Sequence, residues 1–139
     1  MIPFAGWEMP IQYDSILNEA RAVRKKGGVF DVSHMGRIYI SGQQSTGLMD
    51  WIQTGHIGTL REGRARYSLI CNENGGIIDD TVTYRLNESQ YLLVCNAGNR
   101  ESIIDWIDFW RGKRYPDTTV NDVTLSTVMI AVQGPSTPT

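Results

Sequence analysis

The sequence has little of what marks several large classes of protein. Two cysteines in 139 residues are too few for the disulfide framework of a small secreted domain. Cys71 and Cys95 both fall in apolar, strand-like runs, which favours two small apolar side chains in a reduced protein, with a disulfide as the alternative. No histidine and cysteine spacing is typical of a zinc site, so we expect no metal ion.

Neither sign of charge prevails, and long apolar runs are absent. Lys and Arg number 13 and Asp and Glu 15, for a net charge of -2, so the chain has no basic footprint for nucleic acid. No apolar run reaches the ~18 residues that a membrane-spanning helix needs, and no charged start followed by an apolar run indicates a targeting segment. We therefore expect a cytoplasmic protein that binds neither nucleic acid nor membrane.

What is present is an ordinary globular composition in which strand-like and helix-like patterns alternate. Apolar residues make up 41% of the chain and charged residues 20%, as in a typical globular domain. Asn74-Gly75 is a strong hairpin signal between two strand-like runs, and a third run follows a polar turn. The pattern predicts an α+β fold with a mixed, mainly antiparallel sheet, a hairpin or meander, and flanking helices.

The last expected strand differs from the others. We expect an aromatic, packed loop over residues 4–10, helices over 15–26, 44–53 and 99–110, and strands over 37–41, 66–71, 77–85, 91–96, 118–123 and 127–133. Within the last strand, residues 128–132 form an apolar run typical of a strand that is buried on both faces. Such a strand so near the end suggests a piece of a longer polypeptide, whose missing C-terminal part, or a second copy of the chain, covers the open sheet.

Asp80 is the first candidate for a functional residue. Alternation along its strand puts Asp80 on one face with Ile78, Val82 and Tyr84, and that face is otherwise apolar. Asp79 falls on the opposite face, among polar neighbours. A carboxylate on a buried apolar face costs on the order of several kcal/mol unless a partner compensates for it. We therefore expect Asp80, and not Asp79, to have a structural hydrogen bond, a metal or a ligand.

Several short strings along the chain match one known family in order and in spacing. They are FAGWEMP (4–10), FDVSHMG (30–36), YS (67–68), NENGGIIDD (72–80), YR (84–85), VCNAGNR (94–100) and AVQGP (131–135). With them the chain closely resembles the N-terminal part of the T-protein of the glycine cleavage system, an aminomethyltransferase that uses tetrahydrofolate. Thr54-Gly55-His56 departs from the family's usual Thr-Asn-Asp at that loop.

The resemblance also implies how the chain is organised. The family's proteins are more than twice as long and have three domains around a central folate cavity, with segments exchanged between the first and second domains. By that analogy, residues 1–35 are a segment of the first domain, 36–121 are most of the second, folate-site domain, and 122–139 return toward the first. The family's second acidic and aromatic motif and its folate-binding arginines lie outside this chain, so we expect the chain alone to be inactive.

The resemblance assigns five site residues. The family's key aspartate matches Asp80, and its folate-contacting residues match Met35, Tyr67, Tyr84 and Asn96, with Asp80 among the contacts. Aromatic and thioether surfaces with a few fixed polar groups suit a flat pterin ring. The residues alone favour Asp80 as a structural hydrogen-bonding carboxylate and the two tyrosines as core residues, and it is the resemblance that favours folate contacts.

The chemistry implied is transfer of a one-carbon unit. In the family, an aminomethyl group arrives on the lipoyl arm of a carrier protein, tetrahydrofolate takes the carbon, ammonia leaves, and methylene-tetrahydrofolate forms, with the aspartate orienting and polarising a folate nitrogen. The alternatives are a non-catalytic folate-binding or demethylase-type relative, and an assembly domain without chemistry of its own. Asp80 favours the transferase, because a non-catalytic relative need not keep a carboxylate there. We expect His34 to be structural, since nothing pairs it with a nucleophile.

Overall fold

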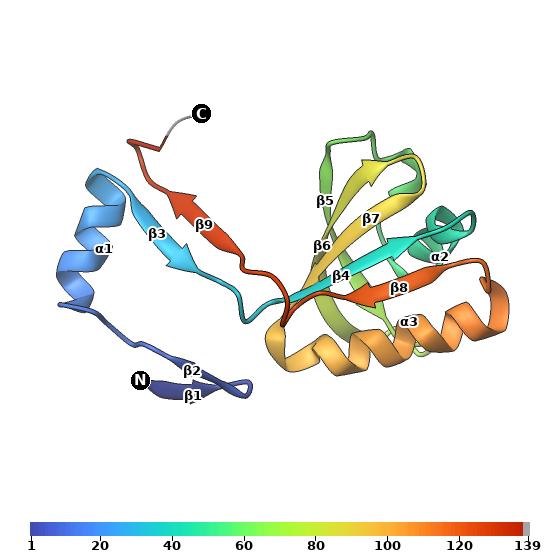
Figure 1. Ribbon diagram of the computed structural model, residues 1–139, viewed down its shortest axis with the longest axis horizontal. Helices are drawn as coiled ribbons and strands as arrows, with labels where there is room; N and C mark the ends of the chain where they lie inside the picture. The colour runs from blue at the N-terminus through green and yellow to red at the C-terminus, as the bar shows by residue number, and fades with distance from the viewer. Residues whose placement is uncertain (138–139) are drawn as a thin grey trace. The chain divides into compact units, whose positions relative to one another are not determined.

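A computed structural model describes residues 1–137 of the chain (Figure 1). The contacts among these residues divide the chain into two compact units. Unit 1 consists of Met1–His34 together with the residues from Thr127 on, and unit 2 is Met35–Ser126. None of the helices in this described part of the chain is long and apolar enough to cross a membrane.

Unit 2 is built on a five-stranded antiparallel sheet in the order β5-β6-β7-β4-β8 (Figure 1). Its strands are β4 (Gly36–Ser41), β5 (Ala65–Cys71), β6 (Ile77–Asn87), β7 (Gln90–Cys95) and β8 (Thr119–Asp122). Strands β5, β6 and β7 form a meander. In its first turn, the side-chain oxygen of Asn72 accepts hydrogen bonds from the backbone N–H groups of Asn74 and Gly76, at 3.0 and 2.9 Å. These elements confirm the predicted α+β class and its mainly antiparallel sheet.

Helices α2 (Ser45–Ile52) and α3 (Arg100–Arg114) pack on one face of this sheet. Two short 3-10 turns, η1 (Ile57–Thr59) and η2 (Ala97–Asn99), lie in the connections. Each fully buried aliphatic side chain in such a core stabilises the fold by roughly 1.5–3 kcal/mol relative to exposure. The helices and the sheet share one apolar core, formed by Ile38, Ile40, Leu48, Met49, Ile52, Ile57, Ile70, Tyr91, Leu93, Cys95, Ile103 and Ile107.

Unit 1 combines one helix with two small antiparallel sheets. The first is a hairpin of β1 (Ile2–Phe4) and β2 (Trp7–Met9), joined by Ala5 and Gly6 with φ angles of 48° and 82°. Helix α1 (Ile16–Lys25) follows, and β3 (Gly28–Asp31) then pairs with β9 (Ile130–Gln133). The hairpin corrects the prediction of an irregular loop over residues 4–10. Two positive φ angles in a two-residue turn match the twist of the paired strands, which is why the chain reverses there.

Strand β9 corrects the predicted start of the last strand. The strand begins at Ile130 rather than at Thr127, and its apolar residues Ile130 and Val132, which share one face, are 50% and 57% exposed in this chain. Its only strand partner among the described residues is β3, in a two-stranded sheet. The expectation that a further part of a longer polypeptide, or a second copy of the chain, covers this strand stays a prediction.

The prediction about the faces of β6 was also wrong. Asp79, Thr81 and Thr83 lie on the face that the helices cover and are 3%, 1% and 0% exposed, whereas Asp80 is exposed. Polar side chains can occupy this interior because they are hydrogen-bonded. The hydroxyl of Thr81, for example, donates to the carbonyl oxygen of Ser68 at 3.1 Å. The alternation was correct from Asp79 to Tyr84, and the face that carries Val82 and Tyr84 is the open one. Ile78 was placed on the wrong face, because it lies at the register shift between β5 and β6 and packs against the core.

Candidate functional site

The second face of the unit 2 sheet is partly open and partly apolar. Val82 on β6 pairs with Tyr67 on β5 and with Val94 on β7, so side chains of three strands share this face. Neither helix of unit 2 packs on it, since both pack on the other face. An extended apolar surface of this kind marks a contact surface for a ligand or another part of a protein. Its half-buried or exposed apolar members are Tyr39, Tyr67, Leu69, Val82, Tyr84 and Leu92.

Asp80 is the anionic group of this open face, and two neighbouring side chains donate hydrogen bonds to it. The Tyr67 hydroxyl donates to Asp80 Oδ2 at 3.2 Å. The Asn96 amide nitrogen donates to Asp80 Oδ1 at 2.9 Å and lies 3.2 Å from the Asp80 carbonyl oxygen. Sequence-predicted residues from β5, β6 and the end of β7 therefore meet at one carboxylate, which is exposed rather than buried.

Asp79 is the buried carboxylate of the pair, and it accepts three hydrogen bonds. Its Oδ2 accepts from the backbone N–H of Asn96 at 2.8 Å. Its Oδ1 accepts from the side-chain nitrogens of Asn96, at 2.8 Å, and Asn99, at 2.7 Å. Hydrogen bonds to an ionised acceptor are among the stronger ones in proteins. Asp79 thereby fixes the connection from β7 to α3, directly beside the exposed cluster.

The Tyr67 hydroxyl has an altered acidity. Loss of solvent contact around the phenol raises the pKa of Tyr67 above its ordinary value, and the negative charge of Asp80, which accepts the hydroxyl's hydrogen bond, raises this pKa further. Both effects favour the neutral phenol, because a phenolate would be less hydrated and would face a carboxylate. Tyr67 therefore acts at this site as a neutral hydrogen-bond donor.

The other two predicted site residues make no hydrogen bond to Asp80 among the described residues. Tyr84 follows Asp80 by four positions on β6, so it shares the open face, and it is 42% exposed. Met35 comes directly before β4, whose first residue pairs with Cys95, the residue before Asn96. Met35 is half-buried, and its carbonyl oxygen accepts a hydrogen bond from Arg37 Nη1 at 2.7 Å.

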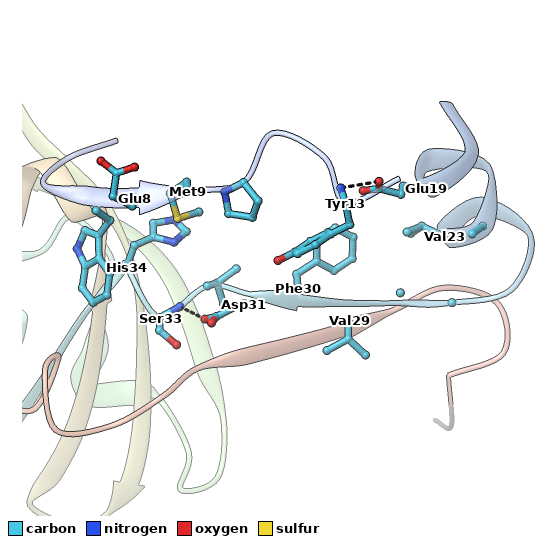
Figure 2. Close-up of a pocket in the computed structure, with 16 residues that line it drawn as sticks. Glu8, Met9, Tyr13, Glu19, Val23, Val29, Phe30, Asp31, Ser33 and His34 are labelled. Atoms are coloured by element: carbon cyan, nitrogen blue, oxygen red, sulfur yellow. Dashed lines mark hydrogen bonds between the residues drawn. The ribbon is translucent and has the colours of Figure 1, made fainter. Parts of the chain in front are cut away.

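A separate cavity of about 570 Å³ lies within unit 1 (Figure 2). It contains none of the five predicted site residues. His34 lines it and contacts Phe4 edge to face, with ring centroids 5.6 Å apart. The Nδ1 atom of His34 is buried and has no hydrogen-bond partner among the residues described. On the opposite side of the cavity, Glu19 accepts hydrogen bonds from the backbone N–H groups of Asp14 and Tyr13, which lower the pKa of its carboxyl.

Sequence reasoning missed two of the groups that organise the site. Asp79 was assigned to a polar face, and Asn99 was expected only as the first residue of a helix. Asn99 is the residue before α3, but its side chain makes no cap and donates to Asp79 instead. The available signal was the coincidence of an aspartate on a threonine-bearing strand face with two asparagines directly after the neighbouring strand.

Comparisons with known proteins match the whole chain. Residues 1–139 match the family described as "GCVT N-terminal domain". The "Aminomethyltransferase" of Cutibacterium acnes is 47% identical over 133 residues, covering 96% of this chain and 35% of that protein. The "Aminomethyltransferase" of Thermotoga maritima is 45% identical over 135 residues, covering 97% and 36%.

A solved structure agrees with these sequence relatives. The crystal structure of glycine cleavage system aminomethyltransferase T from Bartonella henselae is similar with a TM-score of 0.89 and 33% sequence identity, covering 96% of this chain and 36% of that one.

The fold and the matches define an α+β segment of the aminomethyltransferase class. The chain belongs to the GCVT N-terminal domain family, which confirms the resemblance to the N-terminal part of the T-protein. It spans about a third of the length of the curated relatives it matches.

Proposed function

We propose that the polypeptide carrying these residues transfers an aminomethyl group to tetrahydrofolate in glycine cleavage. The donor is the lipoyl arm of a carrier protein, where the carbon is bonded to sulfur and nitrogen. The carbon–sulfur and carbon–nitrogen bonds break, and two carbon–nitrogen bonds to the folate form. The two folate N–H protons pass to the arm and to the departing amine, which gives a thiol, ammonia and methylene-tetrahydrofolate with no net oxidation. The proposal includes a cytoplasmic location.

The observation that carries the proposal is the exposed Asp80 carboxylate with its two donors on a partly apolar face. Two hydrogen bonds from Tyr67 and Asn96 leave lone pairs on both carboxylate oxygens, and these can accept N–H groups of a bound heterocycle. The surrounding tyrosine and leucine side chains offer flat apolar surface for a ring. This combination supports folate as the ligand and Met35, Tyr67, Asp80, Tyr84 and Asn96 as its contacts.

Asp80 has the central role in this proposal. A carboxylate that accepts a hydrogen bond from a folate nitrogen orients that nitrogen toward the incoming carbon and can take up its proton as the new bond forms. A positioned acid or base of this kind contributes on the order of 10²–10⁴ in rate. Tyr67 and Asn96 hold the carboxylate in place, because each donates to a different oxygen of it.

The test is a substitution series in the polypeptide that carries this chain, assayed with tetrahydrofolate and an aminomethylated lipoyl carrier. Asp80→Asn is expected to lower turnover by about 10²-fold or more, as loss of a positioned general base implies. Asp105→Asn on α3 is the matched control, because Asp105 is also exposed but lies on a helix outside the open face. Equal turnover in the two variants would refute the proposal. Folate binding without any transfer would favour the non-catalytic folate-binding relative instead.

The 139 residues alone form only part of this proposed enzyme. The relatives are nearly three times as long, and the family's further folate-binding arginines lie in the remainder. We expect the isolated chain to show little or no transfer activity. Turnover by the isolated chain at the rate of the longer polypeptide would contradict this expectation.

A further inference from the structure

We propose that Asp79 is a positioning residue that fixes the side-chain amide of Asn96 so that a ligand on the open face meets a hydrogen-bond acceptor there. The ligand class this selects is a heterocycle that presents N–H groups along its edge. The identity of that ligand rests on the proposed function, but the positioning itself rests on the geometry of this chain alone.

The first step is that Asp79 holds Asn96 at two points. One oxygen of Asp79 accepts the backbone N–H of Asn96 at 2.8 Å, and the other accepts the side-chain nitrogen of the same residue at 2.8 Å. Because the backbone N–H and the side-chain nitrogen of Asn96 are tied to one carboxylate, the rotation of its side chain is fixed. Asp79 is itself held, since it is 3% exposed and also accepts the Asn99 side-chain nitrogen at 2.7 Å.

The second step concerns which atom of the Asn96 amide faces inward. Three oxygens surround its nitrogen: Asp79 Oδ1 at 2.8 Å, Asp80 Oδ1 at 2.9 Å and the Asp80 carbonyl at 3.2 Å. All three are acceptors. A flipped amide would place its own oxygen against two carboxylates, which is repulsive. The nitrogen therefore faces these oxygens, and the Asn96 oxygen must point away from them.

The third step is the consequence for recognition. Within residues 1–137, the structure gives the Asn96 side-chain oxygen no hydrogen bond, so this oxygen is available as an acceptor. Asp80, on the same face, is an acceptor as well. A ligand that lies here therefore meets hydrogen-bond acceptors. An analogue whose ring nitrogens carry no hydrogen at these positions leaves the Asn96 oxygen and the Asp80 carboxylate unpaired. Such mismatches discriminate strongly between ligands, because polar groups that the ligand covers are then left without partners.

The ligand-based test compares two buried polar residues of the same strand face. In the polypeptide that carries this chain, Asp79→Asn should weaken tetrahydrofolate binding by about tenfold or more, as loss of one well-oriented hydrogen bond to the ligand implies. Thr83→Val is the control, because it removes a buried hydrogen bond to Gln53 but does not touch Asn96. Its dissociation constant should stay within about threefold of the unsubstituted protein, a difference smaller than one hydrogen bond. Equal weakening in both variants would mean that Asp79 is merely structural and would overturn the inference.

A second measurement needs neither ligand nor substitution. Nuclear magnetic resonance can measure how fast the side-chain amide protons exchange with solvent. The amide of Asn96 should exchange much more slowly than that of Asn74, which is exposed in the turn between β5 and β6. Equal exchange rates would show that Asp79 does not hold the amide, and would overturn the inference even if Asp79→Asn fails to fold. If the amide is protected but the polypeptide binds no reduced folate, the proposed function fails while the positioning by Asp79 stands.

Discussion

Asp79 and Asp80 are neighbours in sequence with opposite roles in the fold. Asp79 is buried and accepts three hydrogen bonds from the segment that leads into α3. Asp80 is exposed and accepts two, from Tyr67 and Asn96. Because Asn96 donates to both, the pair forms one network in which the inner carboxylate provides rigidity and the outer one is accessible to a ligand. A strand can divide the two tasks between adjacent residues because successive side chains point to opposite faces.

The division of roles predicts that the two substitutions lower stability by different amounts. Asp79→Asn should lower the free energy of unfolding by about 3 kcal/mol, because an amide nitrogen would face buried donors in place of an ionised acceptor. Asp80→Asn should lower it by less than about 1 kcal/mol, as is usual for exposed polar groups. Urea unfolding of both variants measures the difference. A larger loss for Asp80→Asn would contradict the burial that separates the two residues.

A second prediction at this scale concerns the phenol of Tyr67. Its pKa is raised by loss of solvent contact and by the charge of Asp80, so it should titrate above the ordinary value of 10.0 for tyrosine. Asp80→Asn removes the charge and should move this pKa back toward the ordinary value, though not fully, because the partial loss of solvent contact and the charge of Asp79 remain. Nuclear magnetic resonance of ring-labelled tyrosine, assigned with Tyr67→Phe, follows the titration. An unchanged pKa in Asp80→Asn would show that the carboxylate does not act on this hydroxyl.

Sequence reasoning correctly predicted that site residues share one face of the sheet, but it was wrong about whether that face is buried. Alternation correctly put Asp80 and Tyr84 on one face of their strand, and antiparallel pairing brings Tyr67 and Asn96 to the same face. It was wrong about which face is buried, because it counted apolar residues and could not see the partners that allow Asp79 and the threonines to be interior. The assignment of these residues as folate contacts stays a prediction.

At the scale of elements, the turn between β4 and α2 depends on Gly42. Its φ angle is 116°, and an added Cβ would lie 2.3 Å from the carbonyl oxygen of Asp117. Gly42→Ala should therefore lower stability by about 2 kcal/mol or more, through backbone strain and this clash. Gly112→Ala in α3 is the control with opposite sign, because nothing lies within 4 Å of its Cβ and alanine favours a helix by up to ~1 kcal/mol. Thermal unfolding of the two variants should shift in opposite directions, and a parallel shift would contradict this account.

The elements that could be predicted are those whose pattern is long and local. The meander β5–β6–β7 follows from alternation and the Asn74-Gly75 turn, and α3 from its helical apolar spacing. Strand β3 could not be predicted, because it has four residues and its partner β9 lies about a hundred positions away along the chain. The hairpin β1–β2 was missed for a related reason, since strands of three residues are too short to show the alternation of apolar and polar side chains that predicts a strand.

For the whole molecule, apolar burial is concentrated in one unit. Every buried apolar side chain of the described residues lies in unit 2, from Ile38 to Ile107. Unit 1 exposes large apolar side chains on several elements, including Phe4, Leu17 and Val29, which are 51%, 65% and 71% exposed. Its stability must then come mainly from hairpin and helix hydrogen bonds, which contribute only modestly when water can reach them. The correspondence of the two units to the expected segments 1–35, 36–121 and 122–139 stays a prediction.

This asymmetry predicts how the isolated chain opens. Backbone amides in the middle of β4 are hydrogen-bonded between β7 and β8 and lie over the buried core, so they should exchange with solvent only through global unfolding of unit 2. Amides of β3 and β9 lie in a two-stranded sheet with exposed side chains, so they should exchange through local opening, at rates at least about 10²-fold higher. Hydrogen exchange of Ile40 and Phe30 measures the two classes, since Ile40 is fully buried and Phe30 is 42% exposed. Equal exchange at both positions would mean that the two units unfold together and would contradict this prediction.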